Sequence, residues 1–410
     1  MEHYIKEIRI DRLRHLSDIV ISLNPEGRQH LLITGKNGSG KTSLLMAIRE
    51  YLQAINEGLP RNLKEDYVYR LLDAEKRLEA AKTESEKSEA EIECIYYRQA
   101  IKRFKDGVNI QFNAYAEIDA LYRQGDFVTA FFPADRKTEI IRSHGVEEIR
   151  LNDFYGIDSA PGELLHKYMV HLKTQQSYAI NEGDNANADR IQKWFDRFVG
   201  ALQILLEDES VALEYRYKEY DFKIHQQGRN PFGLDELSDG YSSVIHMISD
   251  LILRMDRNWL LTDCLSEYDV EGIVLIDELE THLHIELQKK ILPFLTEFFP
   301  RIQFIVTTHS PYILNSVANA RAFDLERGME LENPFLYSAD GLAEGYFDAD
   351  AYAGELVRAM ERYGHLKEKQ NLTDEERAER AMLRSRLKNI PDGFAQEARD
   401  RFEEIEGRRL

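Results

Sequence analysis

The segment GKNGSGKT, residues 35–42, constrains the fold of this chain more than any other part of its sequence. It fits the pattern G-x-x-x-x-G-K-[S/T] completely. A continuous apolar run, HLLIT at 30–34, precedes it, and a segment at 42–55 with apolar residues at helical spacing follows it. This order predicts a buried parallel strand, a phosphate-binding loop and a helix. An α/β fold built on a P-loop is therefore expected.

The residue types of this loop suit a nucleoside triphosphate. The glycines let the backbone wrap closely around phosphates, and the backbone amides and the start of the helix face the anion. Lys41 is expected to reach the β- and γ-phosphates, and Thr42 offers a hydroxyl to Mg²⁺. ATP and Mg²⁺ are the expected cofactors. The predicted nucleotide-binding residues of the loop are Gly35, Lys36, Asn37, Gly38, Ser39, Gly40, Lys41 and Thr42.

Two later apolar runs end in residues that suit ATP hydrolysis. GIVLIDE at 272–278 predicts a strand that ends in two carboxylates. Asp277 would hold Mg²⁺, and Glu278 would activate the attacking water as general base. The run IQFIVTTHS at 302–310 predicts a second buried strand, which places His309 beside the γ-phosphate. Glu278, Lys41 and His309 are the predicted catalytic residues.

Three motifs together carry a resemblance to a known family. LSDGYSS (237–243) resembles the ABC signature, DELETHLH (277–284) a Walker B strand that runs into a D-loop, and TTHSPYIL (307–314) a switch-histidine segment. Residues 1–58 and about 211–320 resemble the ABC-type ATPases of the RecF, SMC and OLD-like branch. The resemblance implies that two copies meet head to head, with Ser238 and Gly240 on the γ-phosphate held by the other copy. Residues 280–284 would then lie at the dimer seam.

The resemblance also indicates further residues and one departure. Similarity to the N-terminal arginine of these proteins makes Arg12 or Arg14 a candidate nucleotide contact, and Gln111 is one candidate for the Q-loop glutamine. The signature carries Asp239 and Tyr241 where transporters usually have glycine and glutamine. This difference favours the RecF and OLD branch over the transporters.

The chain is expected to have three parts. Residues 1–58 and 211–330 would form the ABC-type ATPase head with a mixed or parallel sheet. Residues 59–210 would be an insertion that includes a helical hairpin at 61–105, bent near 83–89. Residues 331–410 would be a helical, partner-binding tail. Its apolar side chains need a surface to cover, either on a partner or on the chain's own head, namely Leu356, Met360, Leu383, Leu387 and Ile390. Further strands are expected at 4–10, 18–23, 108–118, 127–132 and, as a pair, 211–224, and helices at 160–210 with Trp194, Phe195 and Phe198 as a packing face.

Charge and composition limit the partners. The formal net charge of −20 disfavours a chain that holds DNA by itself, because Lys and Arg contacts to phosphates dominate such affinity. No apolar run reaches the roughly 18–20 residues of a membrane span, and the N-terminus lacks an apolar signal core, so a cytoplasmic protein is expected. Cys94 and Cys264 stand apart without a CxxC pattern, which argues against a disulfide framework or a zinc ribbon.

Three functions fit this description. The first is an ATPase, homodimeric or of higher order, that regulates a separate effector. Here the chain resembles the PtuA-type ATPases of Septu and retron-associated antiphage systems, which implies an HNH nuclease as partner and nucleic acid bound through the complex. The second is a DNA-repair or recombination ATPase that binds DNA directly. The third, the nucleotide-binding subunit of a transporter, would need a groove for a membrane coupling helix.

Two short patterns have a second interpretation. His282 and His284 form an HxH that could bind a metal, although no further ligands follow at metal spacing. Asp348 and Asp350 form a DxD, as in the TOPRIM nucleases fused to OLD-like ATPases. The residues after Leu314 leave little room for such a domain. We therefore expect neither a metal centre nor a nuclease in this chain.

Overall fold

The computed structural model describes residues 2–59, 66–105, 107–115, 117–136, 140–261, 270–345, 354–369, 371–388, 402–403 and 405–407. The chain divides into two compact units, Met1–Leu336 and Tyr337–Leu410. The first unit holds every predicted ATPase motif. Among the described residues, no helix is long and apolar enough to cross a membrane.

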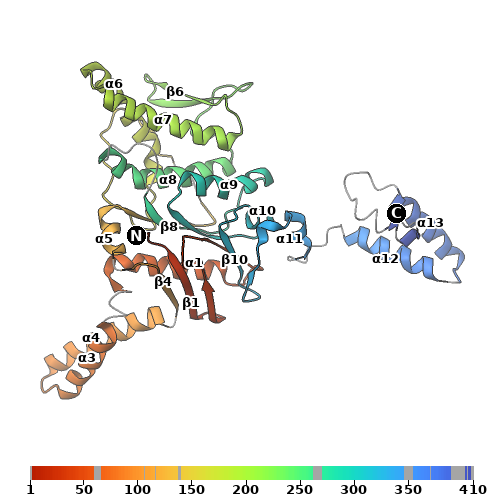
Figure 1. Ribbon diagram of the computed structural model, residues 1–410, viewed down its shortest axis with the longest axis horizontal. Helices are drawn as coiled ribbons and strands as arrows, with labels where there is room; N and C mark the ends of the chain where they lie inside the picture. The colour runs from red at the N-terminus through yellow and green to blue at the C-terminus, as the bar shows by residue number, and fades with distance from the viewer. Residues whose placement is uncertain are drawn as a thin grey trace. The chain divides into compact units, whose positions relative to one another are not determined.

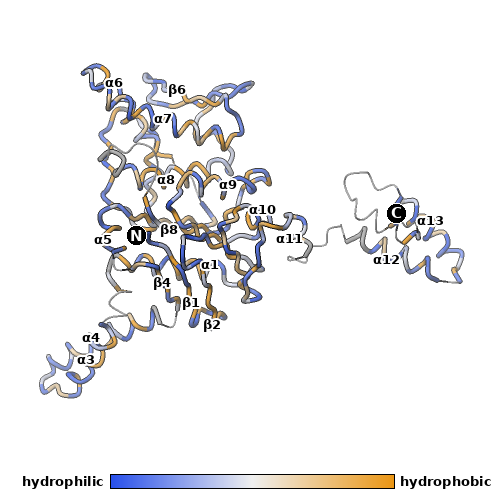
Figure 2. Tube along the Cα trace, in the orientation of Figure 1, coloured by the Kyte–Doolittle hydropathy of each residue, from blue (hydrophilic) through white to orange (hydrophobic). Residues whose placement is uncertain are grey.

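A six-stranded sheet forms the centre of the first unit (Figure 1). Its strand order is β11-β10-β3-β9-β8-β5, and all neighbours are parallel except the edge pair β10–β11. β3, β8 and β9 are buried along their whole length, as the apolar runs predicted, and Figure 2 shows hydrophobic residues concentrated on these central strands. The strands are β3 (His30–Thr34), β5 (Phe127–Phe132), β8 (Glu271–Ile276), β9 (Ile302–Thr307), β10 (Ala320–Asp324) and β11 (Met329–Leu331).

A smaller antiparallel sheet encloses the helix that follows the P-loop. It has the order β2-β1-β4, with β1 at Ile5–Leu13, β2 at Leu16–Ser22 and β4 at Val108–Phe112. Helix α1 (Lys41–Gln53) continues into η1 (Ala54–Glu57) and packs against both β4 and β9. One hydrophobic core therefore joins the two sheets through α1.

The predicted insertion contributes strands to both sheets as well as helices. Helices α3 (Val68–Ala80) and α4 (Glu84–Lys105) form the expected hairpin, which turns at 81–83, and Cys94 is buried within it. The strand predicted at 108–118 is too long, because β4 ends at Phe112, and the next residue, Asn113, bonds to Tyr4 through its backbone and side chain. Residues from Ile118 form helix α5 (Ile118–Gln124) instead.

Three long helices lie on the other side of the central sheet from α1, with α8 next to the sheet and α6 and α7 beyond it (Figure 1). After η3 (Pro161–Leu164), helices α6 (Leu165–Glu182) and α7 (Asn185–Leu206) pack against each other and against the β6–β7 hairpin (Ala212–Arg216 and Asp221–His225). Trp194 stacks on Phe198, and both are buried, as expected of a packing face. Short helix η4 (Leu234–Glu236) leads into α8 (Asp239–Leu261), which contacts β5.

Two more helices connect the last strands of the first unit. Helix α9 (Ile285–Phe298) links β8 to β9, and α10 (Pro311–Leu314) follows β9. The side chains of His284 and Ser310 cap the first turns of these two helices. The unit closes with η5 (Pro334–Leu336).

The second unit has a hydrophobic core of its own. It contains α11 (Ala339–Gly345), α12 (Gly354–Glu368) and α13 (Asp374–Lys388), and the predicted capping box forms between Thr373 and Glu376. The expectation that Met360, Leu383 and Leu387 cover another surface is wrong: these side chains pack together with Tyr363 in this unit's core. The side chain of Leu356, all of Ile390, and the DxD at 348–350 lie outside the described residues, as does Cys264.

Candidate functional site

The predicted motifs meet at one edge of the central sheet. β3, β9, β8 and β5 are neighbours and parallel, so their carboxyl ends lie along the same edge. The P-loop follows β3, the segment 308–310 follows β9, the loop 277–284 follows β8, and the segment 133–136 follows β5. In open parallel sheets, ligands bind at this edge.

The P-loop has the backbone that its glycines predicted. Gly35, Gly38 and Gly40 have φ angles of 133°, 83° and 99°, in the region that disfavours other residues. A Cβ on Gly35 would lie 2.9 Å from the Ser39 hydroxyl and 3.2 Å from an Asp324 carboxylate oxygen. Only a glycine fits at this first position of the loop.

Lys41 lies inside the loop rather than in solvent. Its Nζ donates to the carbonyl oxygens of Gly35 at 2.8 Å and Lys36 at 3.1 Å. Burial lowers the pKa of Lys41, and the negative charges of Glu278, Glu280 and other carboxylates act in the opposite direction. The ammonium is thus held beside the predicted phosphate site with acidic groups close by.

Thr42 and Asp277 are in direct contact. The Thr42 hydroxyl donates to Asp277 Oδ2 at 2.9 Å, and the Thr307 hydroxyl donates to Oδ1 at 2.6 Å. The carboxylate of Asp277 is buried, with 4% of the residue exposed. Hydroxyl and carboxylate oxygens are the ligands that Mg²⁺ prefers, so this pair fits the predicted metal-binding role.

Glu278 is held in an unusual backbone conformation. Its φ is 46°, which is left-handed for a residue with a side chain. Its backbone N–H donates to the Thr307 hydroxyl at 2.7 Å, and the Thr281 hydroxyl lies 3.5 Å from its carboxylate. The carboxylate is half-buried beside Lys41, which suits a base that faces a bound nucleotide.

His309 and Glu280 are joined across the two strand ends. The Glu280 carboxylate accepts from the Thr308 hydroxyl at 2.7 Å and from the backbone N–H of His309. Burial, and then the positive charge of Lys41, lower the pKa of His309, so its ring is neutral at neutral pH. His309 Nε2 is buried and has no hydrogen-bond partner among the described residues, which leaves it available to a ligand.

The signature residues lie next to the 277–284 loop. Ser238 is exposed immediately before α8, whereas Gly240 is buried, and a Cβ on Gly240 would lie 2.5 Å from the His282 carbonyl oxygen. This close approach requires glycine. His284 accepts from the Leu287 backbone N–H at 3.2 Å and contacts the Tyr241 hydroxyl at 3.1 Å. His284 therefore has a capping role, and no group of three or more His, Cys, Asp or Glu within the described ranges could hold a metal with it.

The structure distinguishes the two candidate arginines at the N-terminus. Arg14 lies in the β1–β2 turn with a φ of 55° and lines a cavity of about 590 Å³ together with Thr42, Ser43 and Met46. Arg12 is in the paired part of β1, opposite Ser17, and does not line this cavity. Gln111 lies in β4, opposite Glu7 in the smaller sheet, and its Q-loop role stays a prediction.

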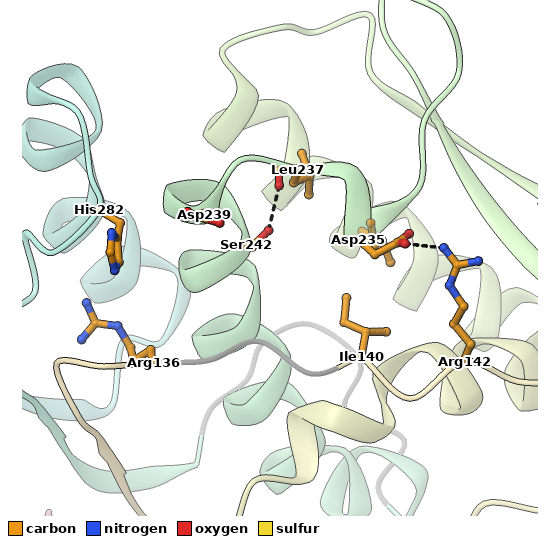
Figure 3. A pocket seen from close by; sticks show the side chains of 9 residues that line it. Arg136, Ile140, Arg142, Asp235, Leu237, Asp239, Ser242 and His282 are labelled. Atoms are coloured by element: carbon orange, nitrogen blue, oxygen red, sulfur yellow. Dashed lines mark hydrogen bonds and ion pairs between the residues drawn. The ribbon is translucent and has the colours of Figure 1, made fainter.

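Arg136 is a residue of the site that sequence reasoning missed. Figure 3 shows the Arg136 side chain directed towards His282, on the wall of a cavity of about 520 Å³. The ion pair between Arg142 and Asp235 lies at the far side of the same cavity. The only signal of Arg136 in the sequence is its position, four residues after the apolar run 127–132.

One family model matches most of the first unit. Residues 31–315 match the family described as "AAA domain, putative AbiEii toxin, Type IV TA system". The match begins in β3 and extends just beyond α10, so it includes the P-loop, Ser238, Asp277 and His309.

Three curated relatives match at low identity. The chain is similar to a Septu protein PtuA of Bacillus mycoides (strain KBAB4), with 24% identity over 81% of this chain and 42% of that protein. It is similar to a Septu protein PtuA of Bacillus thuringiensis, with 25% identity over 77% of this chain and 74% of the relative. A Retron Vc95 probable ATPase of Vibrio cholerae serotype O1 biovar El Tor is 24% identical over 70% of this chain and 67% of its own length. The chain thus spans less than half of the first relative.

Proposed function

This chain belongs to the AAA-domain family whose model covers residues 31–315, and on that premise we propose that it binds and hydrolyses ATP as an ABC-type ATPase. The observation that carries the proposal is the contact of Thr42 with Asp277, because it joins the P-loop to the end of the catalytic strand. Lys41 and His309 lie at the same place, as the effect of Lys41 on the pKa of His309 indicates.

Each residue at this edge of the sheet has a separate proposed role in hydrolysis. The amides of the P-loop and Lys41 bind the phosphates, and Lys41 exchanges its contacts with Gly35 and Lys36 for phosphate oxygens. Thr42 and Asp277 would hold Mg²⁺, which neutralises charge on the phosphates when bound. Glu278 accepts a proton from the attacking water, and the neutral His309 can donate a hydrogen bond to the γ-phosphate. Arg14 and Met46 line the cavity that continues beyond Ser43, where a nucleoside would extend.

Hydrolysis is proposed to need a second copy of the chain. Ser238 is exposed and lies beside His282 and Gly240, on the surface formed by α8 and the 277–284 loop. In a two-fold symmetric dimer, the same surface of each copy would meet the P-loop of the other. Each nucleotide would then be enclosed by the P-loop of one copy and Ser238 of the other.

Mixing two inactive variants tests this composite site. Lys41→Ala removes the phosphate contact, and Ser238→Arg blocks the signature surface, so each variant alone should be inactive. Mixed dimers hold one intact site, and the mixture should recover about a quarter of the wild-type ATPase rate if chains exchange freely and sites act independently.

A matched mixture serves as the control. Lys41→Ala combined with Glu278→Gln should recover nothing, because both residues serve the nucleotide bound to their own chain. Absence of recovery in the first mixture, or ordinary hydrolysis by a wild-type monomer, would contradict the head-to-head site.

The relatives' names suggest the process in which the ATPase acts. They are named for Septu and for a retron, and we extend this to the present chain as an ATPase of antiphage defence. We further propose that it regulates a separate effector of the HNH nuclease class, with the unit Tyr337–Leu410 as the docking element. The net charge of −20 supports a role in which nucleic acid is bound through the complex.

A further inference from the structure

Arg136 is a buried arginine that uses all of its donors. It follows β5, and 8% of the residue is exposed. Its Nε donates to the Ser243 hydroxyl at 2.9 Å. Its Nη1 donates to the carbonyl oxygens of Pro133 at 3.1 Å and Asp277 at 2.8 Å, and its Nη2 to those of Glu278 at 3.2 Å and Leu279 at 3.4 Å. A guanidinium has five N–H donors, so each can have one acceptor here.

Three of these acceptors are consecutive backbone carbonyls at the catalytic strand end. They belong to Asp277, Glu278 and Leu279, the stretch in which Glu278 adopts its left-handed conformation. Such a conformation is strained and persists only where its surroundings hold it. Thr307 bonds to the N–H of Glu278, and Arg136 bonds to its carbonyl. Glu278 is thus fixed from β9 and from the end of β5.

The side-chain acceptor of Arg136, the Ser243 hydroxyl, belongs to the signature helix α8. Ser243 is buried in α8, close to the exposed Ser238 that precedes the helix. The backbone N–H of Ser242 bonds to the Ser238 carbonyl at 2.9 Å, so the start of α8 is continuous with the signature segment. A displacement of this helix would act on the Ser243 hydroxyl and, through it, on Arg136.

Lysine could not replace Arg136 in this arrangement. An ammonium has three donors on one atom, whereas these acceptors come from three separate segments of the chain. Burial lowers the pKa of Arg136 to about 10, so the group remains charged at neutral pH despite its surroundings. Leaving buried carbonyls unpaired around a charged group is costly, which makes the network sensitive to loss of any part.

We propose that Arg136 is a positioning residue that fixes Glu278 for hydrolysis and couples it to the signature helix α8. The inference rests on the proposed ATPase function and adds a regulatory contact to it. Engagement of Ser238 by a second copy would change the position of α8, and the bonds through Ser243 and Arg136 would transmit that change to Glu278. Arg136 does not itself touch the nucleotide.

The test compares turnover with nucleotide affinity in Arg136→Lys, Ser243→Ala and the double variant. Arg136→Lys should lower kcat by about 10- to 100-fold, because small displacements of a catalytic group are enough for such losses. ATP affinity, measured by calorimetry, should change by less than about threefold, because the P-loop is untouched. Ser243→Ala should lower kcat by roughly threefold to tenfold, since it removes one hydrogen bond to a charged group.

Arg254 provides a matched control. It is also a buried arginine, in α8, and its guanidinium bonds to the carbonyl oxygens of Thr129 and Gly156 at 3.0 Å, to the carbonyl oxygen of Ser159 and to the Asp250 carboxylate. None of these partners lies in the 277–284 loop. Arg254→Lys should therefore lower the unfolding midpoint about as much as Arg136→Lys and leave kcat within about threefold of wild type.

Coupling predicts that the two effects on kcat do not multiply. The double variant should be no slower than Arg136→Lys alone, because Ser243 acts through Arg136. Effects that multiply, or a kcat for Arg136→Lys no lower than that of Arg254→Lys, would overturn the proposal.

Amide hydrogen exchange gives a readout that does not depend on turnover. Residues 277–281 should exchange faster in Arg136→Lys and in Ser243→Ala than in wild type or Arg254→Lys. If the wild-type chain does not hydrolyse ATP, the proposed function fails, yet this exchange still decides whether Arg136 and Ser243 hold the loop. Unchanged exchange in both variants would contradict the inference.

Discussion

Thr307 joins the Asp277 carboxylate to the backbone of Glu278 through one hydroxyl group. It donates to Asp277 and accepts from the backbone N–H of Glu278, so a single side chain of β9 sets the positions of both residues at the end of β8. The sequence shows Thr307 only as one threonine of TTHS. Its role depends on the pairing of β8 with β9, which no local pattern reveals.

His30 leads to a pH-dependent prediction at the same scale. Its Nδ1 accepts from the Phe304 backbone N–H at 3.1 Å, and burial lowers its pKa from 6.5 to about 4. The unfolded chain therefore binds a proton at a higher pH than the folded chain, and stability falls as pH decreases from 6.5 towards 4. From pH 7.5 to pH 5.5, this residue should reduce the unfolding free energy by about 1.3 kcal/mol.

Urea unfolding of wild type and His30→Asn measures this contribution. Asparagine keeps an acceptor near Phe304 and does not titrate, so the difference between the two pH profiles isolates His30. The range stays above the sequence isoelectric point of about 5.1. Parallel profiles for the two proteins would contradict the assignment of a neutral, buried His30.

At the scale of elements, the sequence predicts those whose pattern is local. β3, the P-loop and α1 are adjacent in the chain, and β8 and β9 are apolar throughout, so their type follows from periodicity and composition. The end of β4, in contrast, does not follow from a local pattern. Apolar residues continue past Phe112, and only the contacts of Asn113 with Tyr4 show why the strand stops there.

Arg136 shows what local patterns cannot supply. Its acceptors Ser243 and Asp277 are 107 and 141 positions away in the chain. Asp277 lies near Arg136 because β5 pairs with β8, and Ser243 because α8 packs against β5. A charged residue after an apolar run usually faces solvent, so no local pattern predicts that Arg136 is buried. That Lys41, Thr42, Asp277 and Glu278 come together at one edge could be predicted because they belong to motifs with known chemistry.

At the scale of the whole molecule, the unit Tyr337–Leu410 can be tested separately from the ATPase. Met360 and Leu387 are buried in a core of its own, so the unit has the apolar interior of a separately folding part. Deletion of 337–410 should leave the ATPase rate within about twofold of the wild-type rate. The unfolding transition of the unit Met1–Leu336 should be unchanged, because separate cores unfold separately. Copurification with the proposed HNH nuclease partner should be lost.

A core variant of the full chain provides the control for this deletion. Leu387→Asp places a charge in the core of the second unit and should abolish copurification while ATP hydrolysis persists. An insoluble or inactive deletion protein would show that the unit contributes to the fold of the ATPase. Retained copurification would show that the partner binds elsewhere.

The most direct test of the account is the behaviour of Glu278→Gln with ATP and Mg²⁺. Loss of the proposed general base should lower the hydrolysis rate by about 100-fold or more, while the proposed contacts of Lys41, Thr42 and Asp277 should keep the nucleotide bound. Light scattering after gel filtration measures the oligomeric state. Glu278→Gln should form an ATP-containing dimer, which wild type should form only transiently. Lys41→Ala should not form this dimer. Hydrolysis by Glu278→Gln at the wild-type rate, with no ATP-dependent dimer, would contradict the account.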